Sequence, residues 1–91
     1  MSAPTLGRIV HYLLPSEFGH EAWRPAIVVN GPWDGRVNLS VMLDGANDLG
    51  SSEKVEALNQ VGTLTGPGPV LSVGSAREGV EPGCWCWPPR V

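Results

Sequence analysis

Two cysteines and two tryptophans alternate near the C-terminal end of the chain, in the run from Cys84 to Trp87. In a strand, alternate side chains point to opposite faces, so both thiols would share one face and both indole rings the other. Cys84 and Cys86, together with His11 or His20, have the donor atoms of a tetrahedral zinc site. The usual spacing for such sites is Cys-x-x-Cys, however, and the chain has no second pair of cysteines. We therefore expect two small apolar side chains and no bound metal.

A second combination of chemistry-bearing residues is Trp23 with Arg24, which pairs a flat aromatic face with a planar cation. This combination suits a nucleotide base or an anionic ring. The polar run from Asp44 to Asp48 offers oxygens for a ribose or a metal ion. Each feature also has a plainer explanation, because arginine readily forms local ion pairs and Asp, Asn and Gly are common in turns. The predicted ligand-binding residues are Trp23, Arg24, Asp44, Asn47 and Tyr12.

Catalytic residues are much less well supported than binding residues. Either cysteine has the chemistry of a nucleophile and His11 that of a base, but no sequence motif of known mechanism surrounds them. We expect His11 to be a half-buried side chain with a backbone hydrogen-bond partner. The sequence therefore predicts a protein that is not an enzyme and that has no cofactor.

The size and composition of the chain restrict the class of protein. Ninety-one residues predict a single domain, residues 1–91, that buries about two-thirds of its unfolded surface and so has a thin core. Nine acidic and six basic residues give a net charge of −3, with no basic run, so we expect no bulk binding to nucleic acid. No apolar stretch reaches membrane-spanning length, and Met1 to Thr5 lack signal-peptide features. These features, together with two cysteines that we expect to be free thiols, predict that the protein is located in a reducing cytoplasm.

Short runs of β-forming residues predict the elements that position these side chains. The chain contains twelve Gly and nine Pro, which favours short strands and tight turns over long helices. Alternation of apolar and polar residues is clearest from Val37 to Leu43. The predicted strands are residues 8–14, 25–29, 37–43, 70–73 and 84–87. We predict an all-β fold, a small five-stranded SH3-like partly open barrel, with an OB-like barrel as the alternative.

Residues 46–69 have the weakest pattern in the chain. Ser52 to Leu58 predicts a short helix capped by Ser51 or Ser52. Residues 63–69 are rich in Gly and Pro and predict a loop. We therefore expect a long loop or a short helix near residues 46–69, between the third and fourth strands.

The predicted hairpin of strands 25–29 and 37–43 brings candidate ligand-binding residues together. In an antiparallel hairpin, the start of the first strand lies beside the end of the second. Trp23 and Arg24 precede the first strand, and Asp44 and Asn47 follow the second, so we expect all four at one mouth of the barrel. Trp33 lies in the predicted turn at residues 30–35, at the opposite end, and would not share this site.

Four motifs occur in a fixed order along the chain. They are Gly7-Arg8-Ile9-Val10-His11-Tyr12, Pro25 to Val29, Asn38 to Val41 followed by Asp44-Gly45-Ala46-Asn47-Asp48, and Gly83 to Pro88. Together, over most of the chain except its middle part, they resemble a set of small, mostly uncharacterised phage-encoded proteins. The closing motif of that set often reads Trp-His-Trp, where this chain has Trp85-Cys86-Trp87. The resemblance implies a phage origin and a compact fold, but no particular mechanism.

Two classes of function fit these observations. The first is a non-enzymatic phage accessory protein that binds or sequesters a small ligand, such as a nucleotide-type signal, or a host protein through one barrel mouth. Such a protein would act in the host cytoplasm, for example in evasion of host defences. The alternative is a virion structural component, such as a capsid-decorating or connector subunit. In either class we expect a homo-oligomer, with no membrane and no bulk nucleic acid among its partners.

Overall fold

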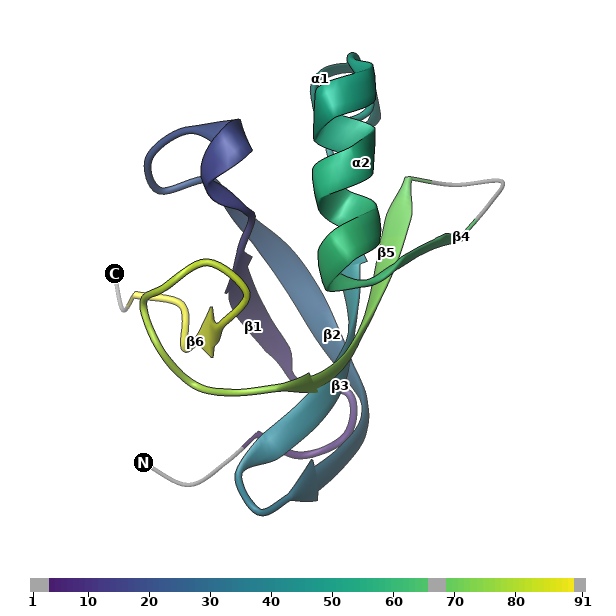
Figure 1. The fold of residues 1–91 in the computed structure, drawn as a ribbon. Helices are drawn as coiled ribbons and strands as arrows, with labels where there is room; N and C mark the ends of the chain where they lie inside the picture. Colours follow the sequence, from purple (N-terminus) through teal and green to yellow (C-terminus); the bar gives the residue numbers. More distant parts are fainter. Residues whose placement is uncertain (1–3, 66–68, 90–91) are drawn as a thin grey trace.

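Antiparallel strands dominate the structure, a computed structural model that describes residues 4–65 and 69–89. The described residues form one six-stranded sheet with the strand order β4-β5-β3-β2-β1-β6 (Figure 1). The strands are β1 (Ile9–Leu13), β2 (Trp23–Trp33), β3 (Arg36–Met42), β4 (Thr63–Thr65), β5 (Val70–Ala76) and β6 (Trp85–Cys86). The helical elements in the same ranges are the 3-10 turn η1 (Ser16–Phe18), α1 (Gly45–Asp48) and α2 (Ser52–Val61). The chain is mostly β, which confirms the predicted all-β fold in its coarse form, and the prediction of five strands is wrong by one.

Alternation along the strands separates an inner, apolar face of the sheet from an outer face. One row of four side chains crosses the sheet, because Val10 pairs with Ala26, Ala26 with Val41, and Val41 with Leu71. All four side chains are fully buried. Burial of such side chains stabilises the fold by roughly 25 cal/mol per Å² of apolar surface removed from water. The period-two pattern within residues 37–43 therefore predicted the correct inner face of β3.

β2 is longer than predicted, because it continues through residues expected to form a turn. The β2–β3 register shifts between Val28 and Asn30 and again between Asn30 and Trp33, so two irregularities accommodate the Gly and Pro of this segment. The turn itself narrows to Asp34 and Gly35. Their φ angles of 56° and 78° lie in the left-handed region that tight hairpin turns require. The predicted hairpin is confirmed, with a shorter turn.

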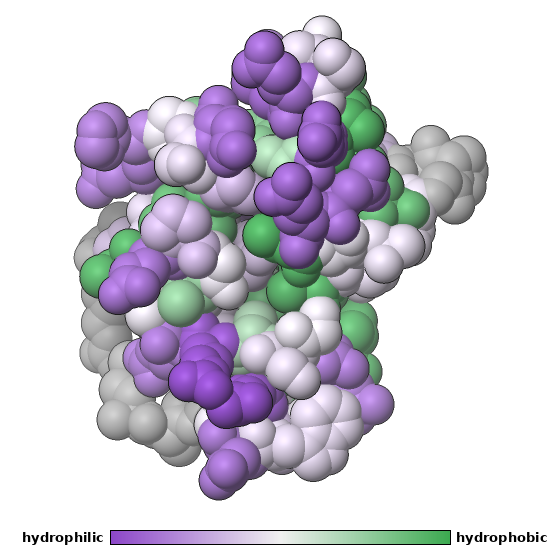
Figure 2. All heavy atoms as spheres, in the orientation of Figure 1, coloured by the Kyte–Doolittle hydropathy of each residue, from purple (hydrophilic) through white to green (hydrophobic). Residues whose placement is uncertain are grey.

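Two helices occupy the chain between β3 and β4. α2 begins as predicted, because the Ser51 hydroxyl accepts a hydrogen bond from the backbone N–H of Lys54 at 3.2 Å. The helix packs Leu58 into the core and carries hydrophilic side chains on its exposed face (Figure 2). α1 lies in the polar run that was expected to form a loop. Neither these helices nor any other in the described ranges is long and apolar enough to cross a bilayer.

β4 corrects the prediction that residues 63–69 form a loop. Its three residues pair with β5, with Leu64 opposite Leu71. A Cβ on Gly62 would lie 2.4 Å from the carbonyl oxygen of Ser72, so the close approach of the two chain segments requires glycine just before β4. Three residues are too few to show a period-two pattern, which is why this strand was not predicted. The rest of the predicted loop, at residues 66–68, lies outside the described residues.

β6, the shortest of the described strands, lies between β1 and the segment that follows β5. It pairs with β1, where Trp85 lies opposite Tyr12 and both side chains are buried. On its other side, the N–H of Trp85 donates to the carbonyl of Arg77, and the N–H of Gly79 donates to the carbonyl of Trp85, each at 2.9 Å. The segment after β5 therefore returns to β6, although the strand ladder of the sheet is not continuous there.

Candidate functional site

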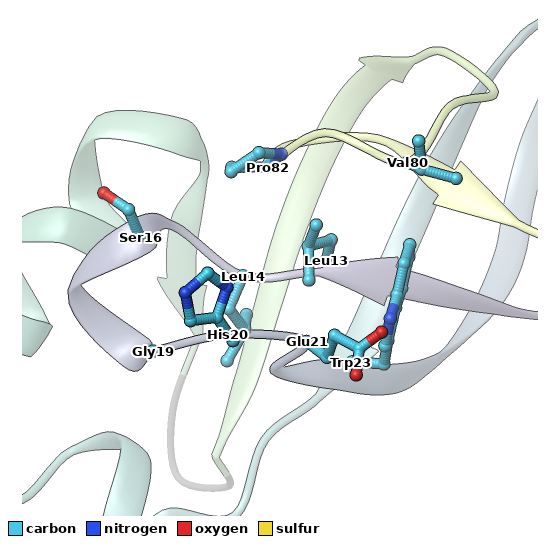
Figure 3. Close-up of a pocket in the computed structure, with 9 residues that line it drawn as sticks. All are labelled: Leu13, Leu14, Ser16, Gly19, His20, Glu21, Trp23, Val80 and Pro82. Carbon is cyan, nitrogen blue, oxygen red and sulfur yellow. The ribbon is translucent and has the colours of Figure 1, made fainter.

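A pocket of about 500 Å³ lies between the β1–β2 connection and the connection that precedes β6. Figure 3 shows Trp23 at one end of its lining and Ser16 at the other, with Pro82 across from His20 and Val80 across from Trp23. We call it the Trp23 pocket. Its lining residues are Leu13, Leu14, Ser16, Gly19, His20, Glu21, Trp23, Val80 and Pro82.

The first wall of the pocket is the β1–β2 connection, which is anchored at its base and at its tip. The N–H of Leu14 donates to the carbonyl of Ala22 at 3.0 Å and closes the loop at its base. At the tip, Phe18 packs against the core, and the Lys54 ammonium lies 5.5 Å from the centre of its ring. These contacts restrict the loop, as a largely preformed binding site requires.

The second wall is the connection that precedes β6. The N–H of Leu13 donates to the carbonyl of Cys84 at 3.0 Å, and the N–H of Gly83 donates to the carbonyl of Leu13 at 2.9 Å. Gly83 has a φ of 90°, a conformation that residues with a side chain rarely adopt, so glycine permits this pairing. The result is that Val80 and Pro82 lie across the pocket from the first wall (Figure 3).

Trp23, the first residue of β2, lines the pocket together with Glu21. Trp23 is half-buried and pairs with Leu13 across the β1–β2 ladder. Glu21 has a φ of 53°, in the left-handed region that residues other than glycine seldom occupy. Its carbonyl accepts a hydrogen bond from the N–H of Trp23 at 2.8 Å. This tight turn brings an aromatic ring and a carboxylate into the lining of one pocket (Figure 3).

Arg24 lies on the other face of β2, in an ion pair with Asp48. Consecutive strand residues face opposite sides, and Arg24 pairs with the buried Tyr12, whereas Trp23 pairs with Leu13. The Arg24 Nε and Nη2 atoms donate to Oδ2 and Oδ1 of Asp48 at 2.8 and 2.7 Å, and Nη1 donates to the carbonyl of Trp23 at 3.0 Å. The Asp48 side chain is only 1% exposed, so this is a bidentate pair with a buried carboxylate. The plainer explanation of Arg24, a local ion pair, is therefore the one that the structure shows.

α1 completes the surroundings of the Asp48 carboxylate. The backbone N–H of Asp44 donates to Oδ2 of Asp48 at 2.8 Å, and Nδ2 of Asn47 donates to Oδ2 of Asp44 at 2.7 Å. Three predicted site residues, Arg24, Asp44 and Asn47, are thus brought together, but in a network centred on Asp48. The side chain of Trp23 does not join them.

Hydrogen bonds and charge keep Asp48 ionised. Burial by itself raises the pKa of Asp48, but the hydrogen bonds from Arg24 and from the Asp44 N–H, with the charges of Arg24 and Lys54, outweigh burial and lower this pKa below its ordinary value. The hydrogen bond to Asp48 also raises the pKa of Arg24, against the opposing effect of burial. Both groups are charged at neutral pH, so the network anchors α1 to β2.

Tyr12, the fifth predicted site residue, is a core residue. Its side chain has no exposed surface, and its hydroxyl has no hydrogen-bond partner within the described part of the chain. Burial, followed by the nearby Cys84, raises the pKa of Tyr12 to about 12. Trp85 is buried beside it, and the rings of Trp85 and Trp87 pack edge to face with their centres 5.8 Å apart. This aromatic group fills the core rather than lining the Trp23 pocket.

Both cysteines are free and half-buried. Cys86 lies opposite His11 on the β1–β6 pair. Burial, followed by the charge of Glu78, raises the pKa of Cys86, which reduces the thiolate form that metals and electrophiles require. Over residues 4–65 and 69–89, no three His, Cys, Asp or Glu side chains converge in a way that holds a metal ion. The absence of bound zinc in solution stays a prediction, which metal analysis tests.

The Trp23 pocket shares one residue with the predicted site. Its other side chains, Glu21 and His20 among them, come from two connections that are far apart in the sequence, so no local pattern marked them. Asp48 was visible at the end of a polar run, but its burial was not. Comparisons of the chain with models of protein families, with curated proteins and with solved structures gave no match.

Proposed function

We propose that the chain is a non-enzymatic binding protein that takes a small ligand into the Trp23 pocket. The observation that carries this proposal is a cavity of about 500 Å³, with a half-buried indole ring, between two connections that backbone hydrogen bonds anchor to the sheet. Small-ligand sites have volumes of roughly 300–1,000 Å³ and a mainly apolar lining with a few polar groups. Here the apolar lining comes from Leu13, Leu14, Trp23, Val80 and Pro82, and the polar groups come from Ser16, His20 and Glu21.

An SH3-like, partly open barrel supports the pocket in this proposal. The strand order favours it, because the last strand β6 pairs with the first strand β1, and β2, β3 and β5 follow in chain order. The hydrogen bonds from the segment after β5 to Trp85 bring the sheet close to closure. The sequence resemblance favours a phage accessory protein that sequesters its ligand in the host cytoplasm.

Fragment screening by NMR tests the proposed site. Small neutral fragments added to the ¹⁵N-labelled protein should shift the amide signals of residues 13–23 and 80–82 first. Trp23→Ala should remove these shifts with little loss of stability, because the ring is half-buried. Trp33→Ala is the matched control, since this ring is 50% exposed at the far end of β2 and its removal should leave binding and stability nearly unchanged.

Two results would contradict the proposed site. One is fragment binding to Trp23→Ala that equals binding to the parent protein. The other is a loss of about 3 kcal/mol or more in the free energy of unfolding of Trp23→Ala, which is the loss expected of a core aromatic residue. In either case the ring is structural and the pocket is not the binding site.

The outer face of β1, β2 and β3 favours a second candidate, a self-associating virion component. Ile9, Val29 and Met42 are 55%, 47% and 36% exposed. Two copies can meet on this face with little like-charge repulsion, because its positions in β1, β2 and β3 carry one charged side chain, Arg36. These positions are Ile9, His11, Leu13, Trp23, Pro25, Ile27, Val29, Arg36, Asn38, Ser40 and Met42. Mass spectrometry of purified virions separates the candidates, since a virion component is abundant there and a sequestering protein is absent.

A further inference from the structure

We infer that the Trp23 pocket takes a small organic cation, in which an ammonium or guanidinium group is attached to an apolar body. This inference rests on the proposed function and adds the chemical class of the ligand. It is carried by the charge of the pocket walls, by the placement of the nearby cations and by the backbone conformation of Glu21.

The charged Asp, Glu, Lys and Arg side chains on the two segments that line the pocket are of one sign. Residues 13–23 and 80–82 supply the whole lining, and they contain three glutamates but no lysine or arginine. The glutamates are Glu17, Glu21 and Glu81. Their three negative charges equal the net charge of the whole chain, which is −3. Glu21 lines the pocket itself, and Glu17 and Glu81 lie on the same two segments outside the lining. A concave site with nearby charges of one sign concentrates ions of the opposite sign, so this pocket attracts cations.

Three cations that adjoin these segments, Arg24, Lys54 and Arg77, are engaged or lie outside the lining. Arg24 follows the indole of the pocket directly in sequence, but its guanidinium lies on the other face of β2, bound to the buried Asp48. Lys54 donates to the carbonyl of Asn47 at 3.2 Å. Arg77 follows β5 and is not part of the lining. An anionic ligand would therefore meet a carboxylate without a compensating cation, which argues against the nucleotide-type ligand that Trp23 and Arg24 suggested.

Glu21 has a strained backbone at the position where its side chain lines the pocket. Its φ of 53° is unfavourable for a residue with a side chain, and the hydrogen bond from the N–H of Trp23 to its carbonyl fixes the turn. Glycine or asparagine would adopt this conformation more easily. Strain of this kind occurs in tight turns, as at Asp34, and also at ligand-binding sites, where a side chain must be held in one position. The strained residue here is the one that supplies the lining carboxylate.

A carboxylate and an indole ring in one lining are complementary to a cation with an apolar body. The Glu21 carboxylate accepts charge-assisted hydrogen bonds from N–H groups of an ammonium or guanidinium. The face of the Trp23 ring attracts the same cation through its quadrupole. The apolar body of the ligand would contact Leu13, Leu14 and Val80. All parts of such a ligand thus have a counterpart in the pocket.

Three aromatic probes of similar size and different charge test the ligand class. They are 2-phenylethylammonium, 2-phenylethanol and phenylacetate, and benzylguanidinium serves as a second cation. Dissociation constants are measured by NMR titration of the amide signals of residues 13–23 and 80–82. We expect the cations to bind about tenfold more tightly than the anion, the ratio that one charge-assisted hydrogen bond provides.

Variants of two glutamates distinguish a direct contact between the ligand and Glu21 from the general attraction of the negative charges around the pocket. Glu21→Gln should weaken cation binding by about tenfold and leave 2-phenylethanol binding unchanged. Glu17→Gln is the matched control, because Glu17 is an exposed carboxylate on the same connection that does not line the pocket. Its effect should stay below about twofold, since salt screens an exposed charge. Glu21→Gly should lose cation affinity while raising stability, because it relieves the strained φ.

The outcomes distinguish the ligand class from the proposed function. Equal affinity for cations and anion, or parent-like cation binding by Glu21→Gln, overturns the ligand class and leaves the pocket as a binding site. Failure of every probe, charged or neutral, to shift the pocket amides at millimolar concentration overturns both. If an end-blocked arginine peptide binds much more tightly than benzylguanidinium, the proposal of a small-molecule ligand is overturned. The pocket would then bind an arginine side chain of a partner protein.

Discussion

Asp48 carries its charge in a buried side chain, and three donors make that burial tolerable. Arg24 supplies two of them and the backbone of Asp44 supplies the third. An intact buried ion pair contributes little net stability, because the cost of desolvation offsets the attraction. Removal of one partner is different, since it leaves a buried charge without compensation. Arg24 therefore matters for the stability of the fold, which its sequence context did not indicate.

Arg24→Ala should lower the free energy of unfolding by about 3 kcal/mol, because the Asp48 carboxylate then stays buried without its partner. Urea denaturation measures this change. Arg36→Ala is the control: Arg36 is a half-buried residue at the start of β3, and its replacement should change stability by less than about 1 kcal/mol. A midpoint for Arg24→Ala equal to that of the parent protein would show that the ion pair does not hold α1 on β2.

The same pair predicts a specific loss of stability in acid. The pKa of Asp48 is lower in the folded protein than its ordinary value of 3.8. Ionised Asp48 therefore stabilises the fold relative to protonated Asp48 at every pH above that ordinary value, and this contribution is lost as the pH falls through the lower folded pKa. Urea denaturation between pH 2 and pH 6 should show this loss for the parent protein and a shallower one for Asp48→Asn. Identical acid profiles for the two proteins would contradict the pKa shift.

Among the secondary-structure elements, β3 was predictable and β4 was not, for reasons of length and spacing. β3 alternates Val37, Leu39 and Val41 inward with polar side chains outward, and all three are buried. β4 has three residues, of which Leu64 alone packs against the core. A single inward residue produces no periodicity, and pairing with β5 is a long-range event that no local pattern encodes. Length therefore explains why β3 could be predicted and β4 could not.

Only the part of the candidate site that follows from the pairing of β2 with β3 could be predicted. The hairpin correctly placed Arg24 near Asp44 and Asn47. It did not separate Trp23 from Arg24, because both were taken as loop residues and β2 in fact begins at Trp23. Inside a strand, adjacent side chains face opposite sides, so one predicted cluster became an ion-pair network and a pocket.

The central row of the sheet can be tested with two adjacent residues of β3. Val41→Asp should unfold the protein, because it places a charge without a partner at a fully buried position, at a cost comparable to total stabilities of about 5–15 kcal/mol. Met42→Asp is the control, since the next side chain is 36% exposed on the outer face. Circular dichroism and thermal melting measure both. A cooperative, parent-like melt for Val41→Asp would mean that the inner face is wrongly assigned.

For the molecule as a whole, the Trp23 pocket forms where the first and last strands meet. β6 pairs with β1, and the connection before it is hydrogen-bonded to Leu13 at the end of β1. The other wall of the pocket starts from that same end of β1 (Figure 1). The pocket is not complete until residues about seventy positions apart, Leu13 and Cys84, have paired, so it exists only in the fully folded chain.

The fold should be independent of metal, although small domains commonly need a disulfide or a metal ion for stability. Apolar residues from β1, β2, β3, β5, β6 and α2 form one connected core that can supply the stability instead. We expect EDTA to leave the melting temperature unchanged, elemental analysis to find no stoichiometric zinc, and Cys86→Ser to melt within a few degrees of the parent protein. About one zinc per chain, lost together with stability in Cys86→Ser, would show that Cys84 and Cys86 are metal ligands. The core would then be too small to hold the sheet alone, and the junction of β1 and β6 would be a metal-stabilised element.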